Sequence, residues 1–373
     1  NLVTLNGRQM PGADAYGDGN SIISGQGAGS RSFNFANISS ESISAVQVYK
    51  TGRADIATGG IGAVVNIKTA RPFDNDGVVV NLGGKAVMGE SNPFDDEITP
   101  EASGIFSYTN DDKTWGVGLN ASYSKRKSGS VQATVNTWNV RPWDGADTTI
   151  AANALIENAP AEGQLYGIPQ DIRYAFSDLE RERINAQAVV QFAPVDSLTL
   201  TLDYTMAEQE LAEDRGEQTI WMQRNGSFDH IIFDTDNPEI ATPIYIHEMT
   251  GGQKDYGWEQ QRNEQKNTLD SVGFNADWRV TDASSLALDF HDSKGESVPN
   301  DPITGGGSTQ FSFAGTNCPV PAGSTTPSCS GFWTQAFAFG TGLPIMTRTL
   351  YPSQADAAAR TNGNSDFQFD AGT

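Results

Sequence analysis

Residues 114–124, TWGVGLNASYS, alternate between two kinds of side chain at every position. Glycine, asparagine, serine and threonine fill one set of positions, and the other set is apolar or aromatic: Trp115, Val117, Leu119, Ala121 and Tyr123. Successive side chains of a β-strand point to opposite faces of its sheet, so this strand has one apolar and one polar face. The same period returns in residues 198–206 and 274–280. The pattern predicts an antiparallel sheet whose two faces differ in polarity.

The alternation extends over seven predicted strands, at 77–88, 100–109, 113–126, 183–193, 198–209, 268–280 and 285–292. Tight turns join three pairs of these strands, whereas connections of about 55 residues, at 127–182 and 210–267, exceed the loops of a compact domain. Short turns at one rim and long loops at the other are typical of a transmembrane antiparallel β-barrel rather than of a soluble β-sandwich. Seven strands cannot close an even-stranded barrel without open edges, so we expect a fragment of a larger barrel with more strands beyond residue 373.

The composition narrows the class of protein. The chain carries 46 acidic and 24 basic residues, a formal net charge of −22, and such a surface repels the phosphate backbone of nucleic acids. No apolar run of about 18 residues occurs, so the sequence predicts no transmembrane helix, whereas barrel strands need only alternating apolarity. His230, His247 and His291 lack metal-ligand spacing, and no G-x-S-x-G elbow is present. We therefore expect no enzyme activity, no metal and no cofactor.

Two cysteines, Cys318 and Cys329, flank a stretch rich in proline, serine and threonine. No histidine or third cysteine lies near them, so a zinc site is disfavoured and a loop-closing disulfide is predicted. A disulfide implies an oxidising compartment.

Residues 1–72 differ from the remainder and are predicted to form a small α+β domain that precedes a sheet domain over residues 73–373. Leu2–Leu5 and the segments 44–49 and 63–69 have the composition and alternation of short strands. The chain has no initiator methionine and no export signal at its start, so we expect it to be part of a longer protein.

Glycines are concentrated in the same N-terminal region. Gly52, Gly59, Gly60 and Gly62 bracket the segment between the last two predicted strands of this region, and we expect them to form tight turns. The spacing G-x-x-x-x-G-K-[ST] of a phosphate-binding loop is absent. Residues 11–32 contain six glycines among polar residues, a composition that predicts a long excursion without regular structure.

Two stretches resemble the plug of TonB-dependent outer-membrane receptors. Residues 1–11, NLVTLNGRQMP, are similar to the family pattern V-L-V-x-x-D-G-x-x, and residues 43–72, ISAVQVYKTGRADIATGGIGAVVNIKTARP, are similar to I-E-V-x-K-G-x-x-x-x-x-x-G-x-x-G-G-x-I-N-I-x-T. Gln47 stands where the family usually has glutamate, Asn6 where aspartate is common, and Ala63 in place of the second glycine. These departures leave the residues of any charge network between plug and wall undefined. The sequence of residues 49–74 resembles the branch of these receptors found in carbohydrate-scavenging proteobacteria.

The resemblance implies a plug inside the lumen of a barrel in the outer membrane of a Gram-negative bacterium. It implies energy-coupled import of a nutrient, most simply an oligosaccharide, with the TonB–ExbB–ExbD complex acting on a segment that precedes Asn1. Outer-membrane lipid would surround the barrel, and a surface lipoprotein is left open as a further partner. A receptor for a ferric siderophore or haem, and a passive porin or adhesin barrel, are the alternatives.

Within that layout, residues 11–32 form an outward plug loop, and four of its side chains are predicted to contact substrate: Asp14, Tyr16, Asp18 and Arg31. Four tryptophans of the long loops are predicted to stack on sugar rings: Trp138, Trp143, Trp221 and Trp258. The alternative is that these tryptophans pack the loops together. Because Arg31 is the only basic residue of the plug loop, we expect a neutral or cationic oligosaccharide and not an anionic chelate.

Overall fold

A computed structural model describes residues 2–11, 40, 43–54, 56, 62–90, 92–94, 97–135, 137–222, 226–250, 257–303, 308–314, 332–339, 343–351, 354–359 and 368–369. Most of these residues lie in β-strands. The helical elements with described bounds are a 3-10 turn at Pro72–Asp74 and α1 (Gln354–Ala359). No helix among these residues is long and apolar enough to cross a membrane.

The chain divides into two compact units. Unit 1 comprises Asn1–Gly129, Asp178–Asp214 and Arg262–Thr309, and unit 2 comprises Ser130–Ser177, Arg215–Gln261 and Gln310–Thr373. The N-terminal strands and the predicted wall strands fall in the same unit, and the predicted domain boundary at residue 72 stays a prediction.

Unit 1 begins with a small sheet of three strands, hereafter the N-terminal sheet. Its strand order is β1 (Leu2–Leu5), β3 (Val64–Thr69) and β2 (Ile43–Tyr49), with β1 parallel and β2 antiparallel to β3. All three strands match the predicted segments. Asn6 and Gly7 have φ angles of 53° and 84°, so this dipeptide makes the left-handed turn that its sequence favours.

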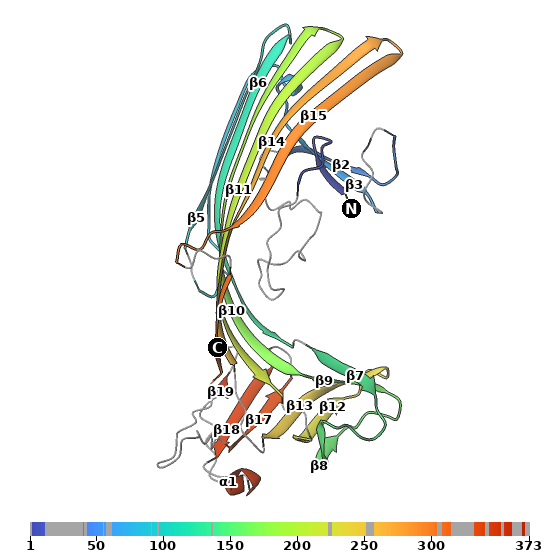
Figure 1. Cartoon of the computed structure of the whole chain (residues 1–373), viewed down its shortest axis with the longest axis vertical. Coiled ribbons are helices and arrows are strands. Elements are labelled where there is room, and N and C mark those ends of the chain that lie inside the picture. Colours follow the sequence, from blue (N-terminus) through green and yellow to red (C-terminus); the bar gives the residue numbers. More distant parts are fainter. Residues whose placement is uncertain are drawn as a thin grey trace. The chain divides into compact units, whose positions relative to one another are not determined.

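Unit 1 also holds most of a large sheet, several strands of which continue into unit 2. Its main strand order is β15 (Ser284–Pro299), β14 (Gly257–Thr281), β11 (Leu198–Trp221), β10 (Asp171–Val195), β6 (Trp115–Thr134), β5 (Thr99–Thr109) and β4 (Gly77–Val87), and β16 (Ser308–Ala314) also pairs with β14. All seven predicted strands are present, and neighbours along the chain are neighbours in the sheet, as Figure 1 shows. The fold is thus β-rich and built on antiparallel pairing, which confirms the coarser part of the predicted fold class.

Strand register gives this sheet two unlike faces. Val80 pairs with Phe106, and Phe106 with Leu119, so three large apolar side chains line up across β4, β5 and β6. Phe274 and Phe290 face each other in the same way on β14 and β15. These side chains are exposed; we call this the apolar face.

The opposite face, here the polar face, is lined by hydroxyl, amide and carboxylate side chains that are buried: Ser107, Gln187, Gln191, Thr201, Asp203, Thr205 and Ser271. The N-terminal region contacts this face through side chains described below. A sheet of a water-soluble protein buries its apolar face and solvates its polar one. The arrangement here is the reverse.

The prediction that residues 127–182 and 210–267 form long loops is wrong, because strands occupy much of both segments. β10 and β14 have 25 residues each and β11 has 24, so these strands continue far into the segments 127–182 and 210–267. The physical reason is visible in β11, where outward Glu208 and Glu210 alternate with Gln209, so that both faces are polar and the contrast that signals a strand disappears.

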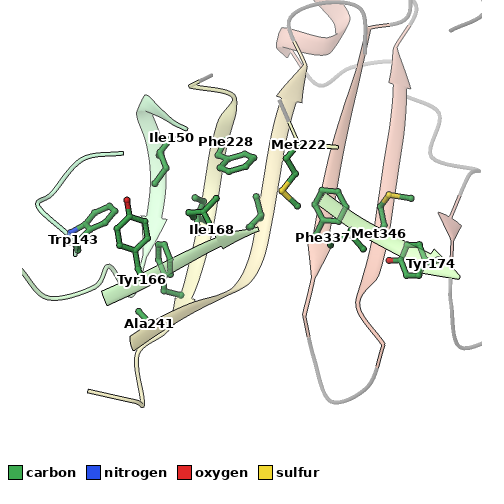
Figure 2. Close-up of a cluster of buried hydrophobic side chains, with 14 residues drawn as sticks. Trp143, Ile150, Tyr166, Ile168, Tyr174, Met222, Phe228, Ala241, Phe337 and Met346 are labelled. Atoms are coloured by element: carbon green, nitrogen blue, oxygen red, sulfur yellow. The ribbon is translucent and has the colours of Figure 1, made fainter. Parts of the chain in front are cut away.

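Unit 2 contains a second sheet, with strand order β19 (Gln368–Phe369), β18 (Ile345–Tyr351), β17 (Phe332–Ala338), β13 (Ile240–Thr250), β12 (Phe228–Asp234) and β8 (Ile150–Glu157). β9 (Leu165–Pro169) pairs with both β13 and β7 (Trp138–Pro142). Its hydrophobic core, drawn in Figure 2, is built around the fully buried rings of Tyr166, Phe228, Phe233 and Phe337.

A buried carboxylate adjoins this core. Asp147 accepts hydrogen bonds from the backbone N–H of Thr149 at 2.7 Å, from its hydroxyl at 2.6 Å, and from the hydroxyl of Tyr166. Burial opposes ionisation of Asp147, but these bonds and the charge of Arg141 outweigh it and hold its pKa below the usual value. Asp147 is therefore a structural anion of unit 2.

Candidate functional site

A buried polar contact of unit 1 is centred on Arg8, which follows the turn that ends β1. Its backbone N–H and C=O exchange hydrogen bonds of 2.9 Å with Leu5, which fixes the direction of the side chain. The guanidinium donates from Nε and Nη2 to Asp289 at 2.7 and 3.0 Å, and from Nη1 to both carboxylate oxygens of Asp203 at 2.8 and 2.9 Å. One cation of the N-terminal sheet thus lies between two carboxylates of the large sheet. We call these three residues the Arg8 cluster.

The surroundings of Arg8 favour the charged form of its guanidinium. Burial disfavours the guanidinium cation, but hydrogen bonds and attraction from Asp289 and Asp203 outweigh that effect and raise the pKa of Arg8. The Arg8 and Asp203 side chains are only 2% and 6% exposed, whereas Asp289 is 35% exposed. A buried charge that loses its partner is costly, so the cluster is a strong attachment of the N-terminal sheet to the large sheet.

Gly273 on β14 makes room for this arrangement. A Cβ atom at that position would lie 1.7 Å from Nη1 and 2.2 Å from Cζ of Arg8, far inside van der Waals contact. Gly273 pairs with His291, two residues after Asp289, so the guanidinium lies directly over the strand at Gly273. Only glycine fits beneath it.

The remaining contacts between the two sheets are mostly polar. Gln187 donates from Nε2 to the hydroxyl of Thr69 at 3.0 Å and to that of Thr205 at 3.1 Å, and the backbone N–H of Phe73 donates to Gln191 at 2.9 Å. A small apolar cluster adds Val3, Leu5, Met10 and Ile67 of the N-terminal region against Ala207 and Leu269 of the large sheet. Hydrogen bonds between such groups can be replaced by hydrogen bonds to water, so separating this interface costs less free energy than separating a purely apolar one.

The predicted plug residues are only partly described. Asp14, Tyr16, Asp18, Arg31, Gly59, Gly60, Cys318 and Cys329 lie outside the described residues. A Cβ atom on Gly52 would meet open space, with no other part of the described chain within 4 Å, and Gly62 lies in a bend just before β3. Their proposed roles stay predictions.

The four predicted tryptophans are not brought together into one site. Trp143 is 7% exposed and contacts Tyr166 edge-on with centroids 5.0 Å apart, so it is a core residue of unit 2. Trp138 and Trp221 are 40% and 45% exposed, and Trp138 lies 6.1 Å from the ring of Phe339. Trp258 lies on β14, and its side chain is outside the described part. Stacking on a sugar stays a prediction, for which Trp138 and Trp221 offer exposed rings.

Sequence reasoning missed the Arg8 cluster. Its members are separated by 195 and 281 residues, so no local spacing links them. The one signal in the sequence was the presence of carboxylates, Asp203 and Asp289, at positions that face the same way as serine and threonine in strands with a clear apolar face.

Neither metal ligands nor known relatives identify the site. Within the described ranges, no group of three or more histidine, cysteine, aspartate or glutamate residues is placed to hold a metal ion. No family model, no curated protein and no solved structure matches the chain.

Proposed function

We propose that this chain is part of a TonB-dependent transporter that imports a nutrient, most simply an oligosaccharide, across the outer membrane of a Gram-negative bacterium. In this proposal the large sheet is part of the wall of a transmembrane barrel, and the N-terminal sheet is part of the plug in its lumen. The observation that carries the proposal is the reversed polarity of the large sheet, whose apolar face is open and whose polar face is covered.

The apolar face supports a lipid environment. We take the membrane-spanning segments to be 78–82, 104–108, 115–123, 184–192, 198–206, 272–280 and 286–290. Trp115 and Tyr123 lie at the two ends of one such segment, and eight residues of tilted strand span about 19 Å, close to the apolar band of about 25 Å found in outer-membrane barrels. Tyr108 and Trp278 add aromatic rings near the tight turns, where an interfacial girdle is expected.

The polar face supports a solvated lumen with a removable plug. An importer must hold its plug firmly at rest and release it, wholly or in part, when the coupling complex pulls. The Arg8 cluster supplies the firm attachment, and removing one partner of such a buried pair costs about 3–5 kcal/mol. The surrounding hydroxyl and amide contacts can be replaced by water, so movement of the N-terminal sheet would open a hydrophilic path along Gln187 and Thr205.

Energy dependence of uptake tests this function against a passive porin. Cells that produce the full-length protein as their only route for oligosaccharides would be compared with the same cells lacking the coupling complex. The proposal predicts that uptake of the transported oligosaccharide stops without the complex. Equal uptake in both strains would point to a passive pore and would overturn the proposal.

A further inference from the structure

A second group of charged residues lies on the polar face, away from the Arg8 cluster. Strand register places Lys85, Glu101 and Ser124 side by side on β4, β5 and β6. Arg126 donates to Glu101 at 2.8 Å from Nε and 2.7 Å from Nη2, and Arg183 donates from Nε to the hydroxyl of Ser124 at 3.3 Å.

Arg181, two residues before Arg183, adds a fourth cation to this group. It makes no ion pair with any residue that the structure describes, and burial together with the charges of Arg183 and Arg126 lowers its pKa. Lys85 and Arg126 both pair with the carboxylate of Glu101, in a chain whose net charge is −22. We call Lys85, Arg126, Arg181 and Arg183 the basic cluster. Cations gathered in this way repel one another, and an added anion relieves that repulsion.

Three members of the basic cluster, Lys85, Arg126 and Arg183, line a hollow with a volume of about 120 Å³, and Arg181 lies outside that lining. The lining also includes the carboxylate of Glu101, which pairs with Lys85 and Arg126, and the hydroxyls of Ser103, Ser122 and Ser124. A Cβ atom on Gly83 would lie 2.7 Å from the Ser103 hydroxyl, so glycine at this position leaves that hydroxyl undisturbed. The hollow has room for about four water-sized groups, enough for a carboxylate and part of the ring that carries it.

The position of the hollow fits a route of uptake. It lies on the polar face, at the ends of the membrane-spanning segments that are opposite the tight turns at 110–114, 196–197 and 282–283. Short turns are periplasmic in bacterial barrels, so a solute coming from outside would meet the basic cluster before it reached the Arg8 cluster.

We propose that the basic cluster binds the carboxylate of an acidic oligosaccharide, one that contains uronic acid units, on its way through the barrel. Guanidinium groups match carboxylates in charge and in planar geometry, and the three serine hydroxyls can bond to the neighbouring sugar hydroxyls. The inference rests on the proposed importer function and narrows its substrate class. It replaces the expectation of a neutral or cationic substrate, which relied on residues 11–32 alone.

Calorimetric titration of the full-length protein in detergent tests the proposal with two matched probes. Trigalacturonate and its fully methyl-esterified form differ in charge but have the same sugar rings. We expect the acid to bind, the ester to bind at least about tenfold more weakly, and Arg183→Gln, at a cation that lines the hollow, to weaken binding of the acid about tenfold or more. Lys294→Gln is the control, because it removes one exposed cation that lies outside the basic cluster.

Three results would overturn the proposal: no binding of the acid, equal binding of acid and ester, or unchanged affinity in Arg183→Gln. Ferric dicitrate is a third probe, and binding of this chelate without trigalacturonate would assign the basic cluster to a metal chelate instead. Binding in detergent does not need the coupling complex. A failure to bind the acid would therefore leave the conclusion from the uptake experiment unchanged. Loss of energy dependence in the uptake experiment would likewise leave the binding result untouched.

Discussion

Replacing Arg8 with methionine should loosen the N-terminal sheet more than any other single change in unit 1. Arg8→Met removes four N–H···O contacts and leaves Asp203 and Asp289 facing each other without a cation. Loss of one partner from a buried ion pair costs about 3–5 kcal/mol. Asp289 is one-third exposed, so water relieves part of its charge and the lower end, about 3 kcal/mol, applies.

Hydrogen exchange with mass spectrometry measures this loosening locally. A loss of about 3 kcal/mol corresponds to a roughly hundredfold drop in protection of the backbone amides of β1 and β3, if these open together. Amides of β5 should keep their protection, because this strand does not contact Arg8. Lys113→Met is the matched control, since Lys113 pairs with Asp76 at the surface and both side chains are more than half exposed.

A second variant separates lost attraction from uncompensated charge. Adding Asp203→Asn and Asp289→Asn to Arg8→Met should restore part of the protection, because the buried like charges disappear. Unchanged exchange of β1 and β3 in Arg8→Met would refute the assignment of Arg8 as the main attachment, as would equal loss of protection in the Lys113→Met control.

Three further predictions concern other parts of the chain. Gly273→Ala should displace the guanidinium of Arg8 and cause much of the increase in amide exchange of β1 that is expected for Arg8→Met, although no charge is removed. Protection equal to that of the wild type would contradict the close approach of Arg8 to Gly273. Leu119→Lys, on the apolar face, should destabilise the membrane-inserted protein by about 2–4 kcal/mol in denaturant titrations, and a neutral effect would argue against lipid contact. The pKa of Asp147 is depressed in the folded state, so its contribution to stability is present above the unfolded pKa of about 3.9 and is lost as the pH falls below it. Asp147→Asn should therefore reduce the stability of unit 2 at pH 6 and flatten its decline in acid, measured by exchange of the amides around Tyr166; an unaltered acid profile would contradict this role.

Much of the large sheet could be predicted because its strands carry a strong contrast between apolar and polar positions. Trp115 to Tyr123 on β6 is the clearest case, and its register with β5 follows once the tight turn at 110–114 is recognised. The outer ends of β10, β11 and β14 could not be predicted in this way, because both of their faces are polar. Unit 2 was missed for a related reason: its strands are short and pair across long separations, as β13 does with β17.

The candidate site could be predicted only in outline. The resemblance in residues 1–11 drew attention to the segment that contains Arg8, but its partners come from β11 and β15 and are found only when strand register is known. The basic cluster has the same origin, since β4, β6 and β10 each contribute to it and no window of sequence contains all four cations. Register, rather than local composition, creates both groups.

The central claim is that the apolar face of the large sheet lies against lipid while its polar face surrounds the N-terminal sheet. Spin labels on Leu82, Leu119 and Phe274, and on Ser107 and Thr201 of the polar face, test it directly in reconstituted membranes. We predict that the first three labels collide with dissolved oxygen far more than with a water-soluble nickel chelate, and that the other two show little contact with oxygen. Ready access of the nickel chelate to Leu82, Leu119 and Phe274 would contradict the claim.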